Sequence, residues 1–343
     1  MSDKRYIHLI TSLEAGGAQK VLFDYFTNID AKTIEKSMVV SLRKRDLYTD
    51  KLESIGVKVI SVDKLYDWFK VFKILISRYN CFKAWMYHAC FLTLIPRCVG
   101  NVDIVWSIHH GRIDFKTDSI STIIFSKLCA LMSNIIPRAV VFVSDDCKRN
   151  HFGLGFNKLN SHVIYNFVDS KFFVPDPITR LNSVAFVGRD HPNKNLDLFL
   201  KVAREFHENK QSISFFVAGE LSESRLKEYS YNNVTFLGRV NDVKSVYQNA
   251  KVYVCTSYTE SFGLTLIEAS LCGCVVVCPD EKIFREVTFN KAIYYKQDNL
   301  FCLYSSIEKA LRINATDSGI SCLIKDKYSS ENTIERLKSL IQG

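Results

Sequence analysis

The sequence predicts an α/β protein with two domains, each built on a doubly wound parallel sheet. Three observations carry this prediction. The 343 residues are about twice the length of an ordinary domain. Short apolar runs alternate with longer stretches of helical period, which is the pattern of β-α-β units. The same rhythm starts again after residues 168–182, an aperiodic stretch with two prolines that we interpret as the interdomain linker.

Each half of the chain contributes five predicted strands. They lie at residues 6–11, 36–42, 57–62, 103–108 and 139–144, and then at 183–188, 213–219, 234–238, 251–256 and 274–279. The clearest helical patterns lie at 18–29, 121–136, 145–153, 195–209 and 264–272. We therefore expect a first domain over residues 1–170 and a second over 171–327, with a closing helix at about 328–343 that packs back on the first.

The composition is that of a folded soluble protein, with 47% hydrophobic and 24% charged residues. The first residues are charged, and the apolar run that follows is too short for a signal peptide or a spanning helix, so we expect a cytoplasmic protein. Its eleven cysteines are odd in number and mostly have apolar neighbours, which favours reduced, buried thiols. Cys272 and Cys274 form only a C-x-C pair, so no metal site is predicted.

The net charge of +9 is concentrated in the first half of the chain. Such an excess can serve nucleic acid, anionic lipid or a phosphate-bearing substrate. Because the basic residues are dispersed among acidic ones and no nucleic-acid motif occurs, we do not expect nucleic acid as a partner.

Candidate site residues follow predicted strands, where parallel sheets bind their ligands. Gly16 and Gly17 lead from the first strand into a helix, whose free N–H groups suit a phosphate or sugar oxygen, although a plain turn would look the same. Arg189 and Lys194 share one short loop ahead of a helix, where two cations suit a pyrophosphate, although a solvated surface would also carry them.

A third loop, after the strand at 251–256, carries two acids around a glycine. Glu260 lies in the loop, Gly263 permits a tight turn, and Glu268 lies one turn into the next helix. The N–H groups of Leu264 and Thr265 would face a phosphate, while Glu268 would accept hydrogen bonds from vicinal hydroxyls. Alternatively, Glu268 lies solvated on the helix and Glu260 acts as a cap. We favour the binding interpretation because buried carboxylates need partners.

Four motifs together resemble the retaining nucleotide-sugar glycosyltransferases of family 4, which have the GT-B fold of two Rossmann-like domains facing across a cleft. The motifs are the AGGAQ turn at Gly16 and Gly17, IYNFVD at 164–169, Arg189 with Lys194, and Glu260 with Glu268. WMYHAC (85–90) and VWSIHHG (105–111) further resemble bacterial enzymes that build O-antigen, capsule or other surface polysaccharide.

The resemblance implies a role for each matching residue. Arg189 and Lys194 would neutralise the donor diphosphate, Glu268 would hold the ribose hydroxyls, and Glu260 would contact the transferred sugar. His109 would line the reaction centre, with His110 as the alternative for that role, and His88 would face the acceptor. The implied catalytic residues are His109, Glu260, Arg189 and Lys194. The other implied donor-binding residues are Gly16, Gly17, Gly188, Gly238, Phe262, Gly263, Leu264 and Thr265.

The implied reaction is transfer of a sugar from a nucleoside diphosphate, for which we expect a UDP-sugar, by a hexosyltransferase-type enzyme. No D-x-D metal motif occurs in the chain, so we expect metal-independent catalysis without a cofactor. Retention in this family is commonly explained by front-face attack, in which the departing phosphate helps to remove the acceptor proton. A sugar-nucleotide epimerase of the same fold is the alternative function.

The expected acceptor is a glycan on a polyprenyl diphosphate or on lipid A-core, with the anionic inner membrane surface as a further partner. Residues 64–85 mix aromatic side chains with basic ones, as interfacial helices do. An ordinary amphipathic helix packed on the sheet fits this stretch equally well. Its basic residues are Lys64, Lys70, Lys73, Arg78 and Lys83.

Overall fold

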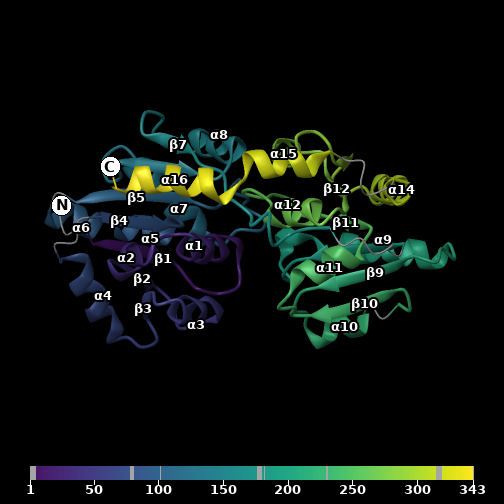
Figure 1. Cartoon of the computed structure of the whole chain (residues 1–343), viewed down its shortest axis with the longest axis horizontal. Helices are drawn as coiled ribbons and strands as arrows, with labels where there is room; N and C mark the ends of the chain where they lie inside the picture. The colour runs from purple at the N-terminus through teal and green to yellow at the C-terminus, as the bar shows by residue number, and fades with distance from the viewer. Residues whose placement is uncertain are drawn as a thin grey trace. The chain divides into compact units, whose positions relative to one another are not determined.

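The chain folds into two units, each an α/β structure around one parallel sheet (Figure 1). The computed structural model describes residues 5–77, 81–100, 102–175, 180, 182–228, 231–313 and 319–342. Unit 1 comprises Met1–Phe167 and Ser330–Gly343, and unit 2 comprises Val168–Ser329. The predicted fold class of two parallel α/β domains is confirmed. The division lies close to the predicted boundary at 170/171, and the closing helix belongs to unit 1.

Unit 1 has a seven-stranded sheet in the order β3-β2-β1-β4-β5-β6-β7, and its strand pairs are parallel. The strands are β1 (Tyr6–Ile10), β2 (Ser37–Ser41), β3 (Lys58–Ser61), β4 (Cys81–Trp85), β5 (Asp103–Ile108), β6 (Ala139–Phe142) and β7 (Ser161–Val163). The helices are α1 (Gly17–Thr27), α2 (Ala31–Glu35), α3 (Leu47–Ser54), α4 (Asp67–Leu75), α5 (Tyr87–Leu92), α6 (Leu94–Val99), α7 (Ile120–Met132), α8 (Asp145–Gly153) and α16 (Ser330–Gln342).

Unit 2 has a six-stranded parallel sheet in the order β10-β9-β8-β11-β12-β13. The strands are β8 (Ser183–Val187), β9 (Ser214–Ala218), β10 (Val234–Gly238), β11 (Val252–Val254), β12 (Val275–Pro279) and β13 (Ile293–Tyr295). The helices are η1 (Pro192–Lys194), α9 (Leu196–Glu208), α10 (Glu223–Glu228), α11 (Val243–Asn249), α12 (Leu264–Leu271), α13 (Lys282–Val287), α14 (Leu300–Leu311) and α15 (Ile320–Lys327).

The chain order reverses at one place in each sheet, between β1 and β4 in unit 1 and between β8 and β11 in unit 2. At such a switch point the two following loops part to opposite faces, which leaves a crevice at the carboxyl ends of the strands. The glycine pair at 16–17 follows β1, the loop with Arg189 follows β8, and the loop with Glu260 follows β11. The topology therefore places these three predicted loops where such sheets bind ligands.

The two faces of the unit 1 sheet carry different helices. On one face, His8 of β1 contacts Tyr25 and Phe26 of α1, with ring centroids 5.5 and 4.9 Å apart. Helix α16 reaches the carboxyl edge of the same sheet, because Thr333 Oγ1 donates a hydrogen bond of 3.3 Å to the carbonyl of Tyr165; Figure 1 draws this last helix in yellow across unit 1. On the opposite face, Trp106 Nε1 donates a hydrogen bond of 2.9 Å to Thr93, between α5 and α6.

Three strands escaped the sequence prediction, namely β4, β7 and β13. The interpretation of residues 64–85 as one helical stretch was wrong, because α4 ends at Leu75 and β4 follows it. Arg78 lies outside the described residues. The strand signal of β4 is weak because Lys83 interrupts its apolar run, yet all five residues of β4 are buried.

Lys83 is the most unusual residue of this sheet. Its side chain is 1% exposed, and its Nζ lies 4.3 Å from the ring centroid of Trp85 and 5.2 Å from that of Tyr25. No described residue accepts a hydrogen bond from this Nζ. Burial lowers the pKa of the Lys83 ammonium to about 7. The two aromatic rings offer cation–π contacts, which replace water only in part.

Replacing Lys83 by methionine should flatten the pH dependence of unit 1 stability. In the unfolded chain the Lys83 ammonium binds its proton below about pH 10.5, whereas the folded state takes it up only near pH 7. The free energy of unfolding should therefore rise with pH between these values, by at most about 1.4 kcal/mol per pH unit. Lys83→Met should remove this rise and stabilise the protein at pH 7.

Urea unfolding followed by tryptophan fluorescence measures this effect, because Trp68, Trp85 and Trp106 all lie in unit 1. Lys58→Met, at an exposed position of edge strand β3, is the matched control and should keep the wild-type slope. Equal slopes in wild type and Lys83→Met would show that Lys83 stays charged in the folded protein.

Candidate functional site

An ion pair joins the two loops that flank the switch point of unit 2. Lys194 Nζ lies 2.5 Å from Glu260 Oε1, and Ser257 Oγ donates a hydrogen bond of 2.9 Å to the same oxygen. Burial acts to lower the pKa of the Lys194 ammonium, but the charge of Glu260 outweighs burial and the pKa is raised. Lys194 is therefore a fixed cation, and the structure brings together two residues that lie 66 positions apart in the sequence.

Asn193 holds the two loops at this distance. Its Nδ2 donates to the carbonyl of Thr259 at 2.9 Å, and its Oδ1 accepts from the N–H of Thr259 at 3.2 Å. The carbonyl of Asn193 accepts from the N–H of Tyr258 at 2.8 Å, and Thr256 Oγ1 donates to the carbonyl of Lys194 at 2.7 Å. These bonds fix the backbone on both sides of the ion pair, so the position of Lys194 does not depend on its own long side chain.

Arg189 directly follows the end of β8 but lies apart from this ion pair. Its side chain is exposed, and it forms no ion pair with any described residue. Its charge nevertheless acts on Lys194, since it opposes the rise in that pKa. The next residue, Asp190, pairs with Arg225 at 3.1 Å, and Arg225 also binds Asp197. An exposed guanidinium beside a buried cation is an arrangement that suits a diphosphate.

Gly263 opens helix α12 in the left-handed conformation, with a φ of 83°. No side chain caps this helix, so its first N–H groups, including those of Leu264 and Thr265, lack the usual capping acceptor. The preceding residue, Phe262, is buried with its ring against that of Tyr328, at a centroid distance of 5.1 Å. Phe262 therefore anchors the loop in the core, and its predicted donor contact stays a prediction.

Glu268 lies inside unit 2 and is not solvated, so the alternative of an outward-facing Glu268 is wrong. It is 3% exposed, and its Oε2 accepts a hydrogen bond of 3.2 Å from Tyr247 of α11. The two acids do not share one ion pair, because Lys194 engages Glu260 alone. Both carboxylates contribute to raising the pKa of the Tyr253 phenol, although burial is the main cause. The binding of ribose by Glu268 stays a prediction.

Close backbone approach also shapes the carboxyl edge of the unit 2 sheet. A Cβ added at Gly219, after β9, would lie 1.9 Å from the carbonyl oxygen of Gly188, after β8. Gly219 was not among the predicted site residues. Gly238 ends β10 with a φ of 63°, and a Cβ added there would meet no atom within 4 Å. Gly188 and Gly238 therefore lie at the carboxyl edge, as the sequence prediction places them.

In unit 1, Gly16 and Gly17 form the start of α1 after β1. Gly16 is the N-cap residue and has an extended backbone, and no side chain caps the helix. A Cβ added at Gly16 would lie 2.5 Å from Gln19 Oε1, while Gln19 Nε2 donates to the carbonyl of Ser12 at 3.1 Å. Gly17 is exposed. An uncapped helix start is consistent with both the oxygen-binding turn and the plain turn that the sequence allowed.

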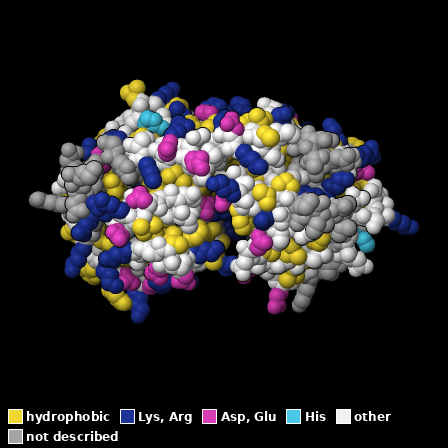
Figure 2. Space-filling view, in the orientation of Figure 1, with side chains coloured by type: hydrophobic (Ala, Val, Ile, Leu, Met, Phe, Trp, Pro, Cys, Tyr) yellow, Lys and Arg dark blue, Asp and Glu magenta, His cyan; other side chains and the backbone are white. Residues whose placement is uncertain are grey.

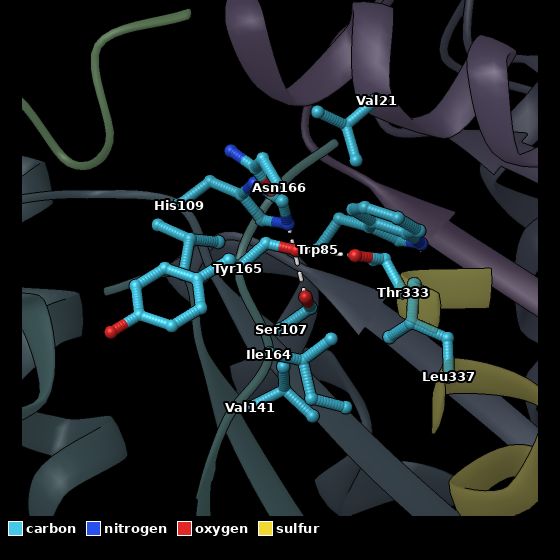
Figure 3. A pocket seen from close by; sticks show the side chains of 11 residues that line it. Val21, Trp85, Ser107, His109, Val141, Ile164, Tyr165, Asn166, Thr333 and Leu337 are labelled. Carbon is cyan, nitrogen blue, oxygen red and sulfur yellow. Dashed lines mark hydrogen bonds between the residues drawn. The ribbon is translucent and has the colours of Figure 1, made fainter. Parts of the chain in front are cut away.

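His109 lines a small cavity at the carboxyl edge of the unit 1 sheet (Figure 3). Its ring stacks on Trp85 at 5.0 Å, and its Nε2 lies 3.0 Å from Ser107 Oγ. Its buried Nδ1 has no hydrogen-bond partner among the described residues. The cavity holds about 10 Å³, room for one water molecule, and Asn166 and Thr333 line it too. Burial, and then the charge of Lys83, lower the pKa of His109 to about 3, so the imidazole is neutral near pH 7.

The other two predicted histidines lie in different surroundings. His110 Nε2 lies 3.1 Å from Asp118 Oδ2, so His110 is held by a carboxylate. His88, on α5, packs its ring against Phe125 at 4.5 Å, and burial, followed by the charge of Arg43, lowers its pKa. The preceding turn is strained, because Met86 has a φ of 70°, which side chains other than glycine rarely adopt.

Several residues of this arrangement carried no sequence signal. Asn193 and Ser257 are single polar residues in loops, and Trp85 meets His109 only because β4 and β5 pair. The glycine at 219 ends a predicted strand, and that position was the one available hint of a close backbone approach. Among the described residues no cluster of three or more potential metal ligands occurs. The eleven cysteines are unpaired thiols, and eight of them are buried.

Residues 169–312 match the model of the family described as "Glycosyl transferases group 1". The chain is 28% identical over 194 residues to one component of human phosphatidylinositol N-acetylglucosaminyltransferase, which covers 52% of this chain and 40% of that protein. It is 22% identical over 312 residues to the putative glycosyltransferase EpsF of Bacillus subtilis, which covers 81% of this chain and 80% of that one. The chain thus spans less than half of the human relative.

A crystal structure of Anabaena Alr3699/HepE in complex with UDP and glucose matches the fold, with a TM-score of 0.85 at 16% identity over 99% of this chain and 100% of that one. The expected GT-B fold and the resemblance to glycosyltransferases are thereby confirmed. Donor, acceptor, stereochemistry and site residues are not addressed by these similarities.

Gly219→Ala should destabilise unit 2 far more than Gly238→Ala. The added methyl at 219 overlaps the Gly188 carbonyl, so the loops after β8 and β9 must separate, whereas the methyl at 238 meets open space. For Gly238→Ala only the left-handed backbone is unfavourable, at about 1–2 kcal/mol. Urea unfolding followed by circular dichroism measures both. Similar losses in the two variants would contradict the close approach.

Proposed function

Because residues 169–312 match the glycosyl transferases group 1 family, we propose that this chain is a glycosyltransferase that moves a sugar from a nucleoside diphosphate, a UDP-sugar, to an acceptor hydroxyl. The observation that carries the proposal is the Lys194–Glu260 pair between the loops after β8 and β11. It lies within the matched residues and at the switch point of their sheet. Both the human and the Bacillus relatives carry glycosyltransferase names.

The proposed chemistry depends on stabilising the departing diphosphate. Lys194 is held cationic by Glu260, Arg189 adds an exposed guanidinium, and the uncapped start of α12 adds partial positive charge. These groups are fixed before substrate arrives, so little reorganisation is needed as negative charge develops on the leaving phosphate. Metal-independent transfer follows as part of the proposal, with the protein's own cations in the place of a divalent ion.

Retention of configuration fits the state of Glu260. A double-displacement mechanism needs a free carboxylate nucleophile close to the sugar carbon. Here Glu260 Oε1 is already engaged by Lys194 at 2.5 Å and by Ser257 at 2.9 Å, which lowers its nucleophilicity. We therefore assign Glu260 to orienting the donor sugar, and front-face attack assisted by the leaving phosphate to the transfer step. Glu268 would contribute its carboxylate to the ribose.

Unit 1 would bind the acceptor. His109 is neutral and presents an unsatisfied Nδ1, so it can exchange a hydrogen bond with a sugar hydroxyl without carrying charge. His110 is the weaker candidate, because Asp118 already engages it. A lipid-linked glycan in bacterial surface polysaccharide synthesis remains the proposed acceptor. The name of the human relative includes a lipid, phosphatidylinositol, which supports an acceptor of this kind.

Lys194→Ala should weaken UDP binding by about tenfold or more and lower the transfer rate by about a hundredfold, since one fixed cation at the leaving group is lost. Calorimetry with UDP measures the binding, and a screen of donor turnover across UDP-sugars and GDP-sugars measures the rate. The matched control is Lys201→Ala, an exposed lysine of α9 in the same unit. Wild-type binding and turnover in Lys194→Ala would refute the proposed site. Release of an epimerised sugar nucleotide without acceptor would favour the epimerase.

Chelation tests the metal-independent part by itself. After treatment with EDTA the transfer rate should stay within about twofold of the untreated rate, because Lys194, Arg189 and the α12 amides supply the charge. A large loss that added Mg²⁺ restores would show that a metal bridges the diphosphate, and it would leave the Lys194 variant as the remaining test of the site.

A further inference from the structure

Helix α4 of unit 1 is apolar on both of its sides. Val71, Ile74 and Leu75 are buried and pack it on the protein. On the other side Phe69 is 72% exposed and Phe72 lies beside it, also exposed, while Leu65 at the entry to the helix is 85% exposed. An amphipathic surface helix normally turns polar residues to solvent. The outward face of α4 therefore has an apolar surface that nothing in the described chain covers.

Helix α7 has a second face of the same kind. Ile120, Ile124 and Leu131 recur at intervals that place them along one side of the helix, and each is exposed, Leu131 at 75%. The helix contains no acidic residue, and Lys127 is its one charged residue. Lys127 Nζ lies 5.8 Å from the ring centroid of Phe115, another exposed aromatic residue just before the helix.

The two helices lie on the same side of the unit 1 sheet. Helix α7 packs against α5 through the rings of Phe125 and Phe91, 5.2 Å apart, and α5 lies on the Trp106 face. The chain runs from β1 through β2 to β3 in one direction and returns from β3 to β4 in the other. Since crossovers between parallel strands are right-handed, α4 lies on the face opposite α1 and α3, which is the face of α5 and α7.

Basic side chains accompany this apolar surface. Lys64, Lys70 and Lys73 are exposed around α4, whereas its one acidic residue, Asp67, is buried and pairs with Lys70 at 2.9 Å. Figure 2 shows hydrophobic side chains and lysine or arginine side chains next to each other at the edge of the molecule where Figure 1 draws α4. The long aliphatic stems of these lysines can lie along an apolar phase while their charges reach its polar boundary.

We propose that this surface, made by α4 and α7, docks unit 1 peripherally on an anionic lipid bilayer. Lysine is depleted in the centres of protein interfaces, so lysines interspersed among exposed aromatic residues favour lipid headgroups over a second copy of the chain. Two separate helices on one side of a sheet also suit an extended flat partner. Within the described residues, no helix has the length and apolar character needed to cross a bilayer.

The inference rests on the proposed function only for the expectation of a lipid-linked acceptor, which a docked unit 1 would meet at the bilayer. It replaces the expectation of one interfacial helix over residues 64–85. Lys83, one of the basic residues of that stretch, is buried in β4 and takes no part.

Flotation of the full chain with vesicles tests the proposal. We expect binding to phosphatidylglycerol–phosphatidylethanolamine vesicles and little binding to phosphatidylcholine vesicles. Binding should weaken in about 1 M salt, where the screening length is about 3 Å. The double variants Phe69→Ser/Phe72→Ser and Ile124→Ser/Leu131→Ser should each reduce binding by about tenfold or more, because each removes two apolar side chains from the interface.

Phe301→Ser is the matched control, because Phe301 on α14 of unit 2 is 79% exposed and lies outside the proposed surface. It should bind vesicles as wild type does. The proposal is overturned if wild type does not bind anionic vesicles at low salt, if the α4 and α7 variants bind equally well, or if the control loses as much. Sedimentation that showed a wild-type dimer and monomeric variants, without vesicle binding, would assign the surface to a second copy.

UDP calorimetry on the same variants separates this inference from the proposed function. The α4 and α7 variants should bind UDP as wild type does, because the proposed donor residues lie in unit 2. Vesicle binding without UDP binding would leave the docking surface standing while the donor site failed, and the reverse result would remove only the docking surface.

Discussion

The ion pair between Lys194 and Glu260 is the interaction on which the candidate site depends. A lysine near the carboxyl end of a parallel sheet would lose hydration without return unless an anion lay beside it, and Glu260 supplies that anion from the neighbouring loop. The pair also fixes which loop faces which, since Asn193 binds the backbone of the same partner loop. Removing either partner would leave the other partly buried and uncompensated, so the charge of this site is built into the fold of unit 2.

The sequence predicted the repeating α/β pattern well because buried parallel strands are short apolar runs that differ visibly from helical periods. It failed where one residue broke the run, as Lys83 does in β4, and where a strand has only three residues, as β7 and β13 do. The motif residues could be placed after strands from the pattern alone. Their partners could not, because Asn193 and Ser257 act through loop contacts that depend on which strands are neighbours in the sheet.

Glu268 illustrates the limit of a motif. Two acids eight positions apart indicate one ligand gripped at two ends, and the structure gives the two acids different environments. Glu260 is paired with a cation, while Glu268 is 3% exposed against the hydroxyl of Tyr247. The spacing fixes only that one acid is in the loop and the other is inside α12. The side-chain environment depends on α11, whose contribution has no counterpart in the motif.

The unit 1 sheet separates two kinds of surface by the alternation of its side chains. The face under α1 and α16 carries His8, Lys83 and Ser107, polar groups that need partners and that lead to the cavity beside His109. The face under α5 and α7 carries Trp106 and is apolar enough to bury further helices. Because a strand residue faces one side only, polar groups for ligand chemistry and apolar groups for docking can be concentrated separately. The same seven strands can therefore support an acceptor site on one face and a lipid contact on the other, and neither set of side chains interrupts the other.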